Sequence, residues 1–265
     1  MCGQDRTFTA LEPIVLANIE SIPDRDLSHI MYAYGVRGLG NPELHAALER
    51  RLEVIADRLD YPSMFNAIYY LLFRESTNEV AWRKIVDNTV AQKETLPLIY
   101  YRPFKVSKLW LRQKFPEWDL EDYIDKFYNA EKYFNVTKLE ELFESDVKYM
   151  QFKAFLTGHC NVYPMPFCSI KNMFVLHYVF YDHKIAINYH LTKFTKSSDS
   201  MPSEMQKLPS KILKGEGWQV MDLSEKEFDS WDYQDRINNI KDWLRAAKQR
   251  QIDNGVIPAQ EPQYV

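Results

Sequence analysis

The sequence predicts an α+β protein in which N-terminal α-helical hairpins are followed by a small α/β domain. Apolar residues recur with the helical period in residues 8–95, for example at Leu27, Ile30 and Met31. The period then changes to that of strands, because residues 173–181 and 184–189 are β-branched and aromatic runs on either side of a short turn. At 265 residues the chain is long enough for two domains, each with its own core.

Local signals in the N-terminal part predict paired helices. Asn41 and Pro42 predict the start of one helix, with the asparagine as its cap and the proline in its first turn. Gly35, Gly38 and Gly40 predict the end of the helix before it. Together these signals predict a helical hairpin.

A shift of 37 positions aligns two helical segments of this part. Residues 29–37 then lie over residues 66–74, with aromatic residues on aromatic residues and Arg37 on Arg74. A period of this length is typical of stacked helix pairs, each too thin to bury its apolar face alone. The alternative is an ordinary helical bundle in which the match is accidental.

We expect the chain to divide into four parts. These are helical hairpin repeats in 1–95, a basic and aromatic connector with further helices in 96–160, the α/β domain in 161–251, and a C-terminal tail in 252–265. Within the connector, a capping box at Thr137 and Glu140 predicts a helix that runs to about residue 156. Two prolines in residues 161–167 predict a rigid extended crossing at the domain boundary.

The connector contains a basic segment with no acid between Glu94 and Glu117, and its prolines predict an extended start over residues 96–103. Basic residues interleaved with aromatic ones can hold phosphates while they stack on bases. The alternative is that the aromatic residues face the core and the basic ones form a solvated face. The candidate contacts for RNA or for a protein partner are Arg102, Lys105, Lys108, Trp110, Arg112 and Lys114.

The α/β part has a definite predicted order after its β-hairpin. A loop in 195–206, a short helix in 208–214, a buried strand in 218–223 and a helix in 235–251 follow one another. Gly215 and Gly217 end the short helix, and Ser224 caps a further turn. The last helix carries an apolar stripe of Ile237, Ile240, Leu244 and Ala247.

This order resembles the RAP domain, an RNA-binding domain abundant in apicomplexans, over residues 172–250. The residues that carry the resemblance are Asn188, Gly217, Trp218, Trp231 and Trp243, and the motif is loose: a Gly-Trp-x-Val strand and a later tryptophan. The helical hairpins resemble the degenerate repeats that accompany RAP domains in organellar RNA-handling proteins. The resemblance implies a mitochondrial or plastid location and a fold similar to restriction-type nucleases.

A nuclease of that type needs carboxylates that converge on Mg²⁺, because hard cations prefer oxygen ligands. Residues 173–181 contain no acid, and Asn188 stands where a related nuclease would have Glu or Asp. A neutral amide cannot neutralise a divalent cation. Asp182 and Asp222 are interpreted as turn or loop residues, so the sequence predicts no catalytic residue and a protein that is not an enzyme.

The sequence also predicts no metal site and no cofactor. His159, Cys160, Cys168 and His177 are residues of the zinc-binding type, but their spacing matches no compact zinc motif, and buried cysteine usually behaves as a small apolar residue. Three cysteines cannot all pair, which favours a reducing compartment.

The amino-acid composition, taken together with this resemblance, indicates the expected function. The chain is 46% apolar with no run of roughly 18 apolar residues, so no transmembrane segment is predicted. A net charge of −4 disfavours RNA as a partner, whereas 14% aromatic residues suit protein interfaces. We therefore expect a non-catalytic accessory subunit of a large mitochondrial assembly, foremost a respiratory-chain or ATP-synthase complex, whose partners are other protein subunits and which contacts the membrane complex peripherally. The alternative is a mitochondrial RNA-binding factor or a mitoribosomal protein.

Overall fold

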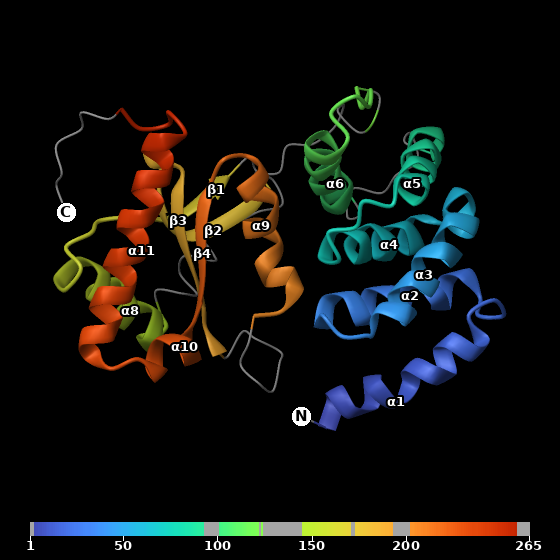
Figure 1. Cartoon of the computed structure of the whole chain (residues 1–265), viewed down its shortest axis with the longest axis horizontal. Coiled ribbons are helices and arrows are strands. Elements are labelled where there is room, and N and C mark those ends of the chain that lie inside the picture. Colours follow the sequence, from blue (N-terminus) through green and yellow to red (C-terminus); the bar gives the residue numbers. More distant parts are fainter. Residues whose placement is uncertain are drawn as a thin grey trace. The chain divides into compact units, whose positions relative to one another are not determined.

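The computed structural model describes residues 3–92, 101–121, 123, 145–170, 173–192 and 202–258. Contacts divide the chain into two compact units, one of residues 1–128 with 203–208 and the other of residues 129–202 with 209–265. Helices and a small mixed sheet together confirm the predicted α+β class (Figure 1). In the described residues, no helix is both long and apolar enough to cross a membrane.

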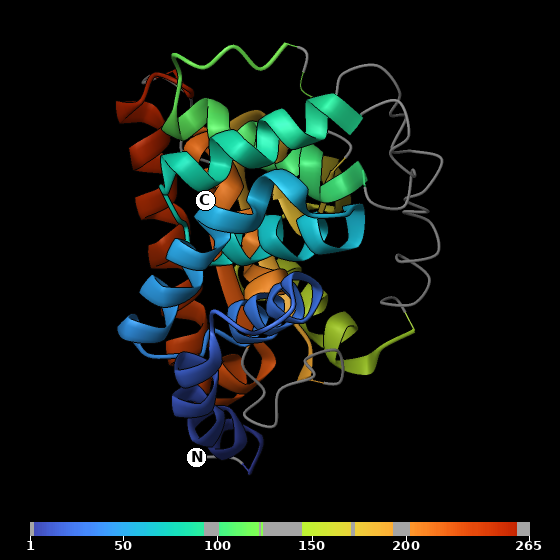
Figure 2. The same cartoon turned by 90° about the vertical axis from the view of Figure 1, so that its right-hand side faces the viewer.

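The first unit is built from helices that stack on one another (Figure 2). They are α1 (Gly3–Asn18), α2 (Asp24–Arg37), α3 (Pro42–Ile55), the short 3₁₀ turn η1 (Ala56–Arg58), α4 (Tyr61–Phe73), α5 (Glu79–Gln92) and α6 (Tyr101–Lys114). Helix α1 packs on α3, α2 on α4, α3 on α5 and α4 on α6. Each of the helices α1 to α4 therefore contacts the α-helix two places further along the chain.

Local chemistry explains where these helices begin and end. The Asn41 side chain accepts a hydrogen bond from the Leu44 amide at 2.8 Å, with Pro42 in the first turn, so the predicted start of α3 is confirmed. Asp60 caps α4 in the same way through the Ser63 amide at 3.0 Å. Gly38 ends α2 in the left-handed conformation, at φ 64°, as predicted.

Gly35 has a different role from the predicted helix end, because it lies inside α2 and is buried against α4. A Cβ atom at this position would lie 3.2 Å from the rings of Phe73 and Tyr70 and 3.3 Å from the Tyr70 Cα atom. The missing side chain therefore lets α2 approach α4 closely, and the helix ends three residues later.

His45 connects three segments of the first unit. Its Nδ1 atom lies 3.0 Å from the Tyr70 hydroxyl of α4, and its Nε2 atom lies 3.0 Å from the Leu39 carbonyl oxygen. Because a carbonyl can only accept, Nε2 carries the proton and Nδ1 accepts from Tyr70. Gly40, at φ 106°, brings the α2–α3 connection against this ring.

The predicted extended start of the basic segment is wrong over residues 101–103, which form the first turn of α6. Pro103 is tolerated there because the first turn of a helix needs no amide donor from its own residues. The rest of that prediction, residues 96–100, lies outside the described residues.

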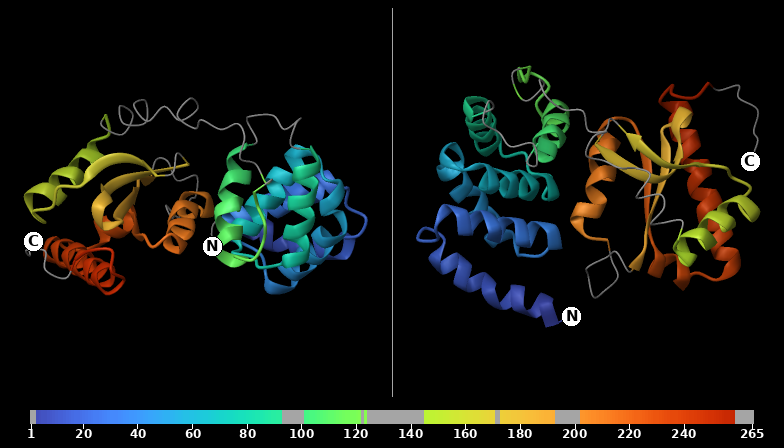
Figure 3. Two further views of the ribbon diagram at one scale, coloured as in Figure 1. Left: turned by 90° about the horizontal axis from the view of Figure 1, so that it is seen from above. Right: turned by 180° about the vertical axis from the view of Figure 1, so that it is seen from behind.

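The second unit is a four-stranded sheet between helices (Figure 3). Its elements are α8 (Val147–Gly158), β1 (Met165–Ile170), β2 (Phe174–Phe180), the 3₁₀ turn η5 (Tyr181–His183), β3 (Ile185–His190), residues 209–215 of α9 (Glu204–Gly215), β4 (Gln219–Ser224), α10 (Glu225–Ser230) and α11 (Tyr233–Asp253). The strands lie in the order β1-β2-β3-β4, with β1, β2 and β3 antiparallel and β4 parallel to β3. A parallel pair needs a crossover connection, and α9 lies in it.

Helices α8 and α11 lie on one side of the sheet and α9 on the other (Figure 1, Figure 3). The first of these faces is an aromatic core, in which Phe152 of α8 stacks on Tyr189 of β3 at 4.1 Å between ring centres. Ile240 and Ala247 of the predicted stripe are buried, and Ile237 and Leu244 pack against the core. The stripe is thus confirmed.

Three boundaries in this unit differ from the predictions. Helix α8 belongs to the unit because its aromatic side chains form the core, so the unit begins before residue 161, the predicted start of the α/β domain. The predicted crossing of residues 161–167 becomes strand β1 from Met165 onward, and the predicted loop at 204–206 is already helix α9, capped by Ser203 and Gln206. The capping box at residues 137–140 and tail residues 259–265 lie outside the described residues.

Strand β1 is irregular in its middle. Pro166 has no amide hydrogen, and Phe167 adopts a left-handed conformation with φ 47°. The Phe167 ring is nevertheless 4% exposed and stacks on Tyr149 of α8 at 5.2 Å. The aromatic contact holds a backbone conformation that a residue with a Cβ atom rarely adopts.

Candidate functional site

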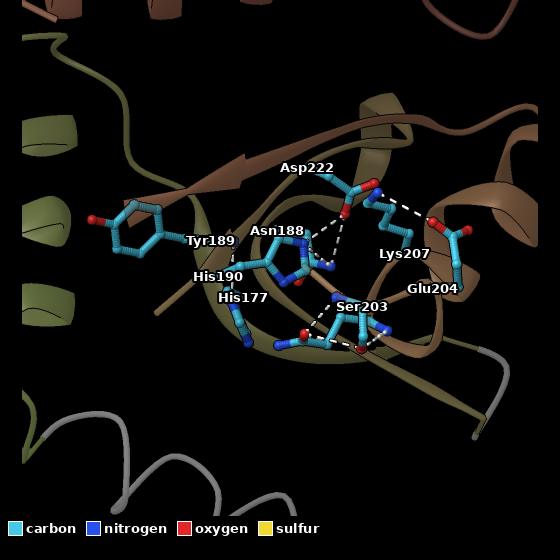
Figure 4. Close-up of polar contacts among 9 residues, drawn as sticks. His177, Asn188, Tyr189, His190, Ser203, Glu204, Lys207 and Asp222 are labelled. Atoms are coloured by element: carbon cyan, nitrogen blue, oxygen red, sulfur yellow. Dashed lines mark hydrogen bonds and ion pairs between the residues drawn. The ribbon is translucent and has the colours of Figure 1, made fainter. Parts of the chain in front are cut away.

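A polar cluster lies on the sheet face opposite the aromatic core. Asn188 and His190 alternate along β3 with Ile187 and Tyr189, which point into that core, and Asp222 lies beside Asn188 on β4. Asn188 and His190 are each 4% exposed. The parallel pairing of β3 with β4 therefore brings an amide, an imidazole and a carboxylate together (Figure 4).

Asp222 is the acceptor at the centre of this cluster. Its Oδ1 atom lies 2.9 Å from His190 Nε2 and accepts from Asn188 Nδ2 at 3.1 Å (Figure 4). The 2.9 Å contact places a proton on Nε2, so the 3.4 Å approach of Asn188 Nδ2 to the same nitrogen brings two donors together and is not a further hydrogen bond. Asp222 thus orients both the histidine ring and the Asn188 amide.

Asp222 was not predicted as a site residue, because the sequence around it shows only a single acid near the end of a strand. The structure corrects the interpretation as a turn or loop residue, since Asp222 lies within β4 and pairs with Asn188 of β3. Only the strand register brings the two together, and no local signal gives the register of a parallel pair joined by a helix. Asp182 lies in the turn η5, as predicted.

His177 lies next to this cluster, at the end of the β2–β3 pairing. The last paired residues are Tyr178 and Ile187, and beyond them the His177 Nδ1 atom accepts a hydrogen bond from the Tyr189 amide at 3.1 Å. The ring therefore replaces a main-chain acceptor where the two strands separate. The His177 and His190 ring centres are 6.5 Å apart.

The pKa of His177 is lowered to about 3, mainly because burial disfavours the charged ring and also because His190 lies beside it. In the first unit, burial and Arg74 lower the pKa of His45 to about 4. Unfolded histidine has a pKa of about 6.5. Between the folded and unfolded pKa values, the unfolded chain binds protons that the folded chain does not. The contribution of these histidines to the unfolding free energy is therefore fully present above pH 6.5 and falls as the pH is lowered.

We predict that each of these two histidines contributes a loss of about 2 kcal/mol in unfolding free energy between pH 7 and pH 5. Urea unfolding at the two pH values measures this loss. His177→Gln and His45→Gln should each remove one share of the pH dependence. A His177→Gln variant with the full pH dependence would contradict the burial of a neutral ring.

The zinc-type residues do not come together around His177. Cys160 is fully buried in the aromatic core with Tyr149 and Leu156, and His159 lies at the surface against Tyr233. Burial raises the pKa of the Cys160 thiol to about 11, which disfavours the thiolate that binds metals. Within the described ranges, no group of three or more His, Cys, Asp or Glu side chains could hold a metal ion.

The basic segment is placed mostly in the core. Trp110 is 2% exposed and its indole nitrogen donates to the Ser76 carbonyl at 3.4 Å, and Phe104 and Phe115 are also buried. Lys108 is 4% exposed, whereas Arg112 and Lys114 are exposed and Arg102 and Lys105 are half-buried. These aromatic rings therefore face the core, as the alternative interpretation predicted, and they are not available to stack on bases.

The other residues that carry the resemblance form a turn and packing contacts in the second unit. Gly217, at φ 81°, begins the turn into β4, and Gln251 of α11 donates to its carbonyl oxygen at 2.8 Å. Trp218 is buried edge-on against Tyr181 at 5.8 Å. Trp231 and Trp243 pack on the aromatic core. Together they connect α11 and the hairpin to the sheet.

No family model matches the sequence, and no curated protein matches it.

Proposed function

We propose that the chain is a non-catalytic accessory subunit of a large mitochondrial assembly and that its second unit is a divergent RAP-like domain. The order of β-hairpin, helix ended at Gly215, strand and long helix supports the domain assignment. The stacking of each helix on the one two places along supports a helical repeat array in the first unit. The mitochondrial location depends on the resemblance alone.

The observation that carries this proposal is the Asn188 cluster. A nuclease would need several carboxylates at this face, and the cluster has a neutral amide hydrogen-bonded to a single carboxylate, which also holds His190. The net charge of −4 favours a respiratory-chain or ATP-synthase complex over a mitochondrial ribosome, since proteins that contact rRNA need a basic surface. Contact with other polypeptides is then the remaining role.

The exposed Arg112 and Lys114 on α6 favour a second candidate function, an organellar RNA-binding factor. Without exposed aromatic rings beside them, binding would depend on phosphate contacts and would weaken steeply with salt.

We predict that the purified chain cleaves no RNA or DNA with Mg²⁺ and binds single-stranded RNA only weakly at physiological salt, with a Kd above roughly 10 µM, in the range of non-specific binding. Filter binding measures the affinity for RNA. Co-migration of a tagged chain on a native gel shows whether it joins respiratory or ribosomal particles. Arg112→Ser with Lys114→Ser should leave incorporation into the assembly intact, as should the matched pair Arg25→Ser with Arg50→Ser. Tight, sequence-selective RNA binding that only the first pair abolishes would establish the second candidate instead.

A further inference from the structure

A hollow of about 600 Å³ lies beside α8 in the second unit. Its floor is formed by the rings of Phe152 and Phe155 from α8, Tyr189 from β3 and Phe228 from α10. This volume lies in the range of sites that bind small molecules or single large side chains. No local pattern of residues predicts this hollow, because its floor comes from three elements that are separate in the chain.

The floor is a rigid aromatic surface. Phe228 meets Phe152 edge-on at 4.9 Å and Phe155 edge-on at 5.2 Å, while Phe152 stacks on Tyr189. Phe155 and Phe228 are 8% and 6% exposed and present an edge to the hollow, whereas Phe152 and Tyr189 are each 1% exposed and support those two rings from within the core. Such an arrangement suits another ring, because aromatic pairs prefer offset and edge-on contacts.

The charges at the rim already neutralise each other. Lys148 Nζ lies 2.7 Å from Asp229 Oδ2 and 3.9 Å from Glu225 Oε1, and Arg236 lies 3.9 Å from Asp229 Oδ1. Arg236 also donates to the Trp231 and Asp229 carbonyls at the end of α10, at 3.1 and 3.2 Å. Two cations thus face two carboxylates. An anionic ligand would have to displace Asp229, which disfavours phosphates and carboxylates.

The mouth of the hollow adds exposed surface of mixed character. Tyr233 is 56% exposed, and its hydroxyl lies 2.8 Å from His159 Nδ1. A second hollow of about 360 Å³ lies across Gln151 and Ala154, which line both, and there Val147 and Met150 of α8 are 69% and 41% exposed. An apolar stripe of this kind on a helix that already buries its other face is typical of an interface.

We propose that the hollow beside α8 receives an uncharged aromatic side chain of a neighbouring polypeptide. This inference rests on the proposed function, because it names the surface through which the accessory subunit holds a partner. A buried aromatic anchor in a preformed pocket, surrounded by a polar rim, is the usual centre of a protein interface. The neutral rim selects against nucleotides, and the exposed stripe along α8 would lie under the partner's backbone.

The test uses the full chain and N-acetyl-tryptophanamide as the probe. Titration followed by amide NMR should give saturable shifts at millimolar concentration that are confined to α8, α10 and the start of α11. Ala154→Trp, which fills the hollow from an exposed position, should weaken probe binding at least fivefold, whereas Ala246→Trp, exposed on α11, should not change it. Tyr233→Ala, at the mouth, is a second variant that removes a wall without adding volume.

Three outcomes would overturn the proposal: no localised shifts, equal binding to Ala154→Trp and to the unchanged chain, or tighter binding of AMP than of the probe at the same residues. The last would assign the hollow to nucleic acid. Native-gel incorporation of Ala154→Trp separates this inference from the proposed function. If the probe binds but the unchanged chain joins no assembly, the accessory role fails and the pocket stands. If the chain joins an assembly and Ala154→Trp joins it equally well, the pocket is not its anchor.

Discussion

Gly40→Ala is expected to lower the unfolding free energy of the first unit by about 4 kcal/mol, the sum of backbone strain and overpacking. At φ 106° the backbone of residue 40 disfavours any side chain. The added Cβ would also lie 2.8 Å from His45 Nε2 and 3.2 Å from the Tyr34 ring. The imidazole cannot move aside easily, because the Tyr70 hydroxyl and the Leu39 carbonyl hold both of its nitrogens. Urea unfolding of the full chain measures the loss.

Two comparisons separate strain from collision in this experiment. Gly255→Ala also has a positive φ, 71°, but nothing lies within 4 Å of its Cβ, so it should cost only about 1 kcal/mol. Combining Gly40→Ala with His45→Ala should cost clearly less than the sum of the single changes, since the second change removes the main collision. A loss for Gly40→Ala no greater than that for Gly255→Ala would show that the His45 ring does not lie where the structure has it.

Phe152→Ala is expected to lower the unfolding free energy of the second unit by about 4 kcal/mol, as for other fully buried phenylalanines. Phe152 is 1% exposed, and its ring stacks on Tyr189 and meets Phe228 and Tyr178 edge-on. Removing it empties the junction of α8, the sheet and α10. Loss of the near-ultraviolet circular dichroism during urea unfolding reports this change.

The control for this variant is Met150→Ala, two residues earlier on the same helix. Met150 is 41% exposed and points away from the core, so its loss should change stability by less than about 0.5 kcal/mol. Equal effects of the two variants would mean that α8 does not pack on the sheet through Phe152.

The sequence predicted features that depend on a few neighbouring residues. Asn41 caps α3 and Gly38 ends α2 through bonds that span at most four positions, so the local pattern was sufficient. The hairpin turn at residues 181–183 and the apolar stripe of α11 follow from the same kind of signal. These elements fix the fold class and the order of the second unit.

Features that depend on distant residues could not be predicted. Strand β1 was missed because its proline argues against a strand, and it pairs only because β2 lies beside it. The joining of Asp222 with Asn188 needs the β3–β4 register, and the hollow beside α8 needs three elements at once. In the basic segment, burial of Trp110 and Lys108 depends on packing that alternating residue types do not specify.

The irregular middle of β1 affects the tendency of the protein to aggregate at high concentration. As the outermost strand of the sheet formed by the described residues, β1 could offer a hydrogen-bonding edge to another chain and start growth of an aggregate. Pro166 removes a donor, and the kinked backbone at Phe167 interrupts the straight edge that a second strand would need. Both features disfavour polymerisation of the sheet through the β1 edge, while the packing of the aromatic core is kept.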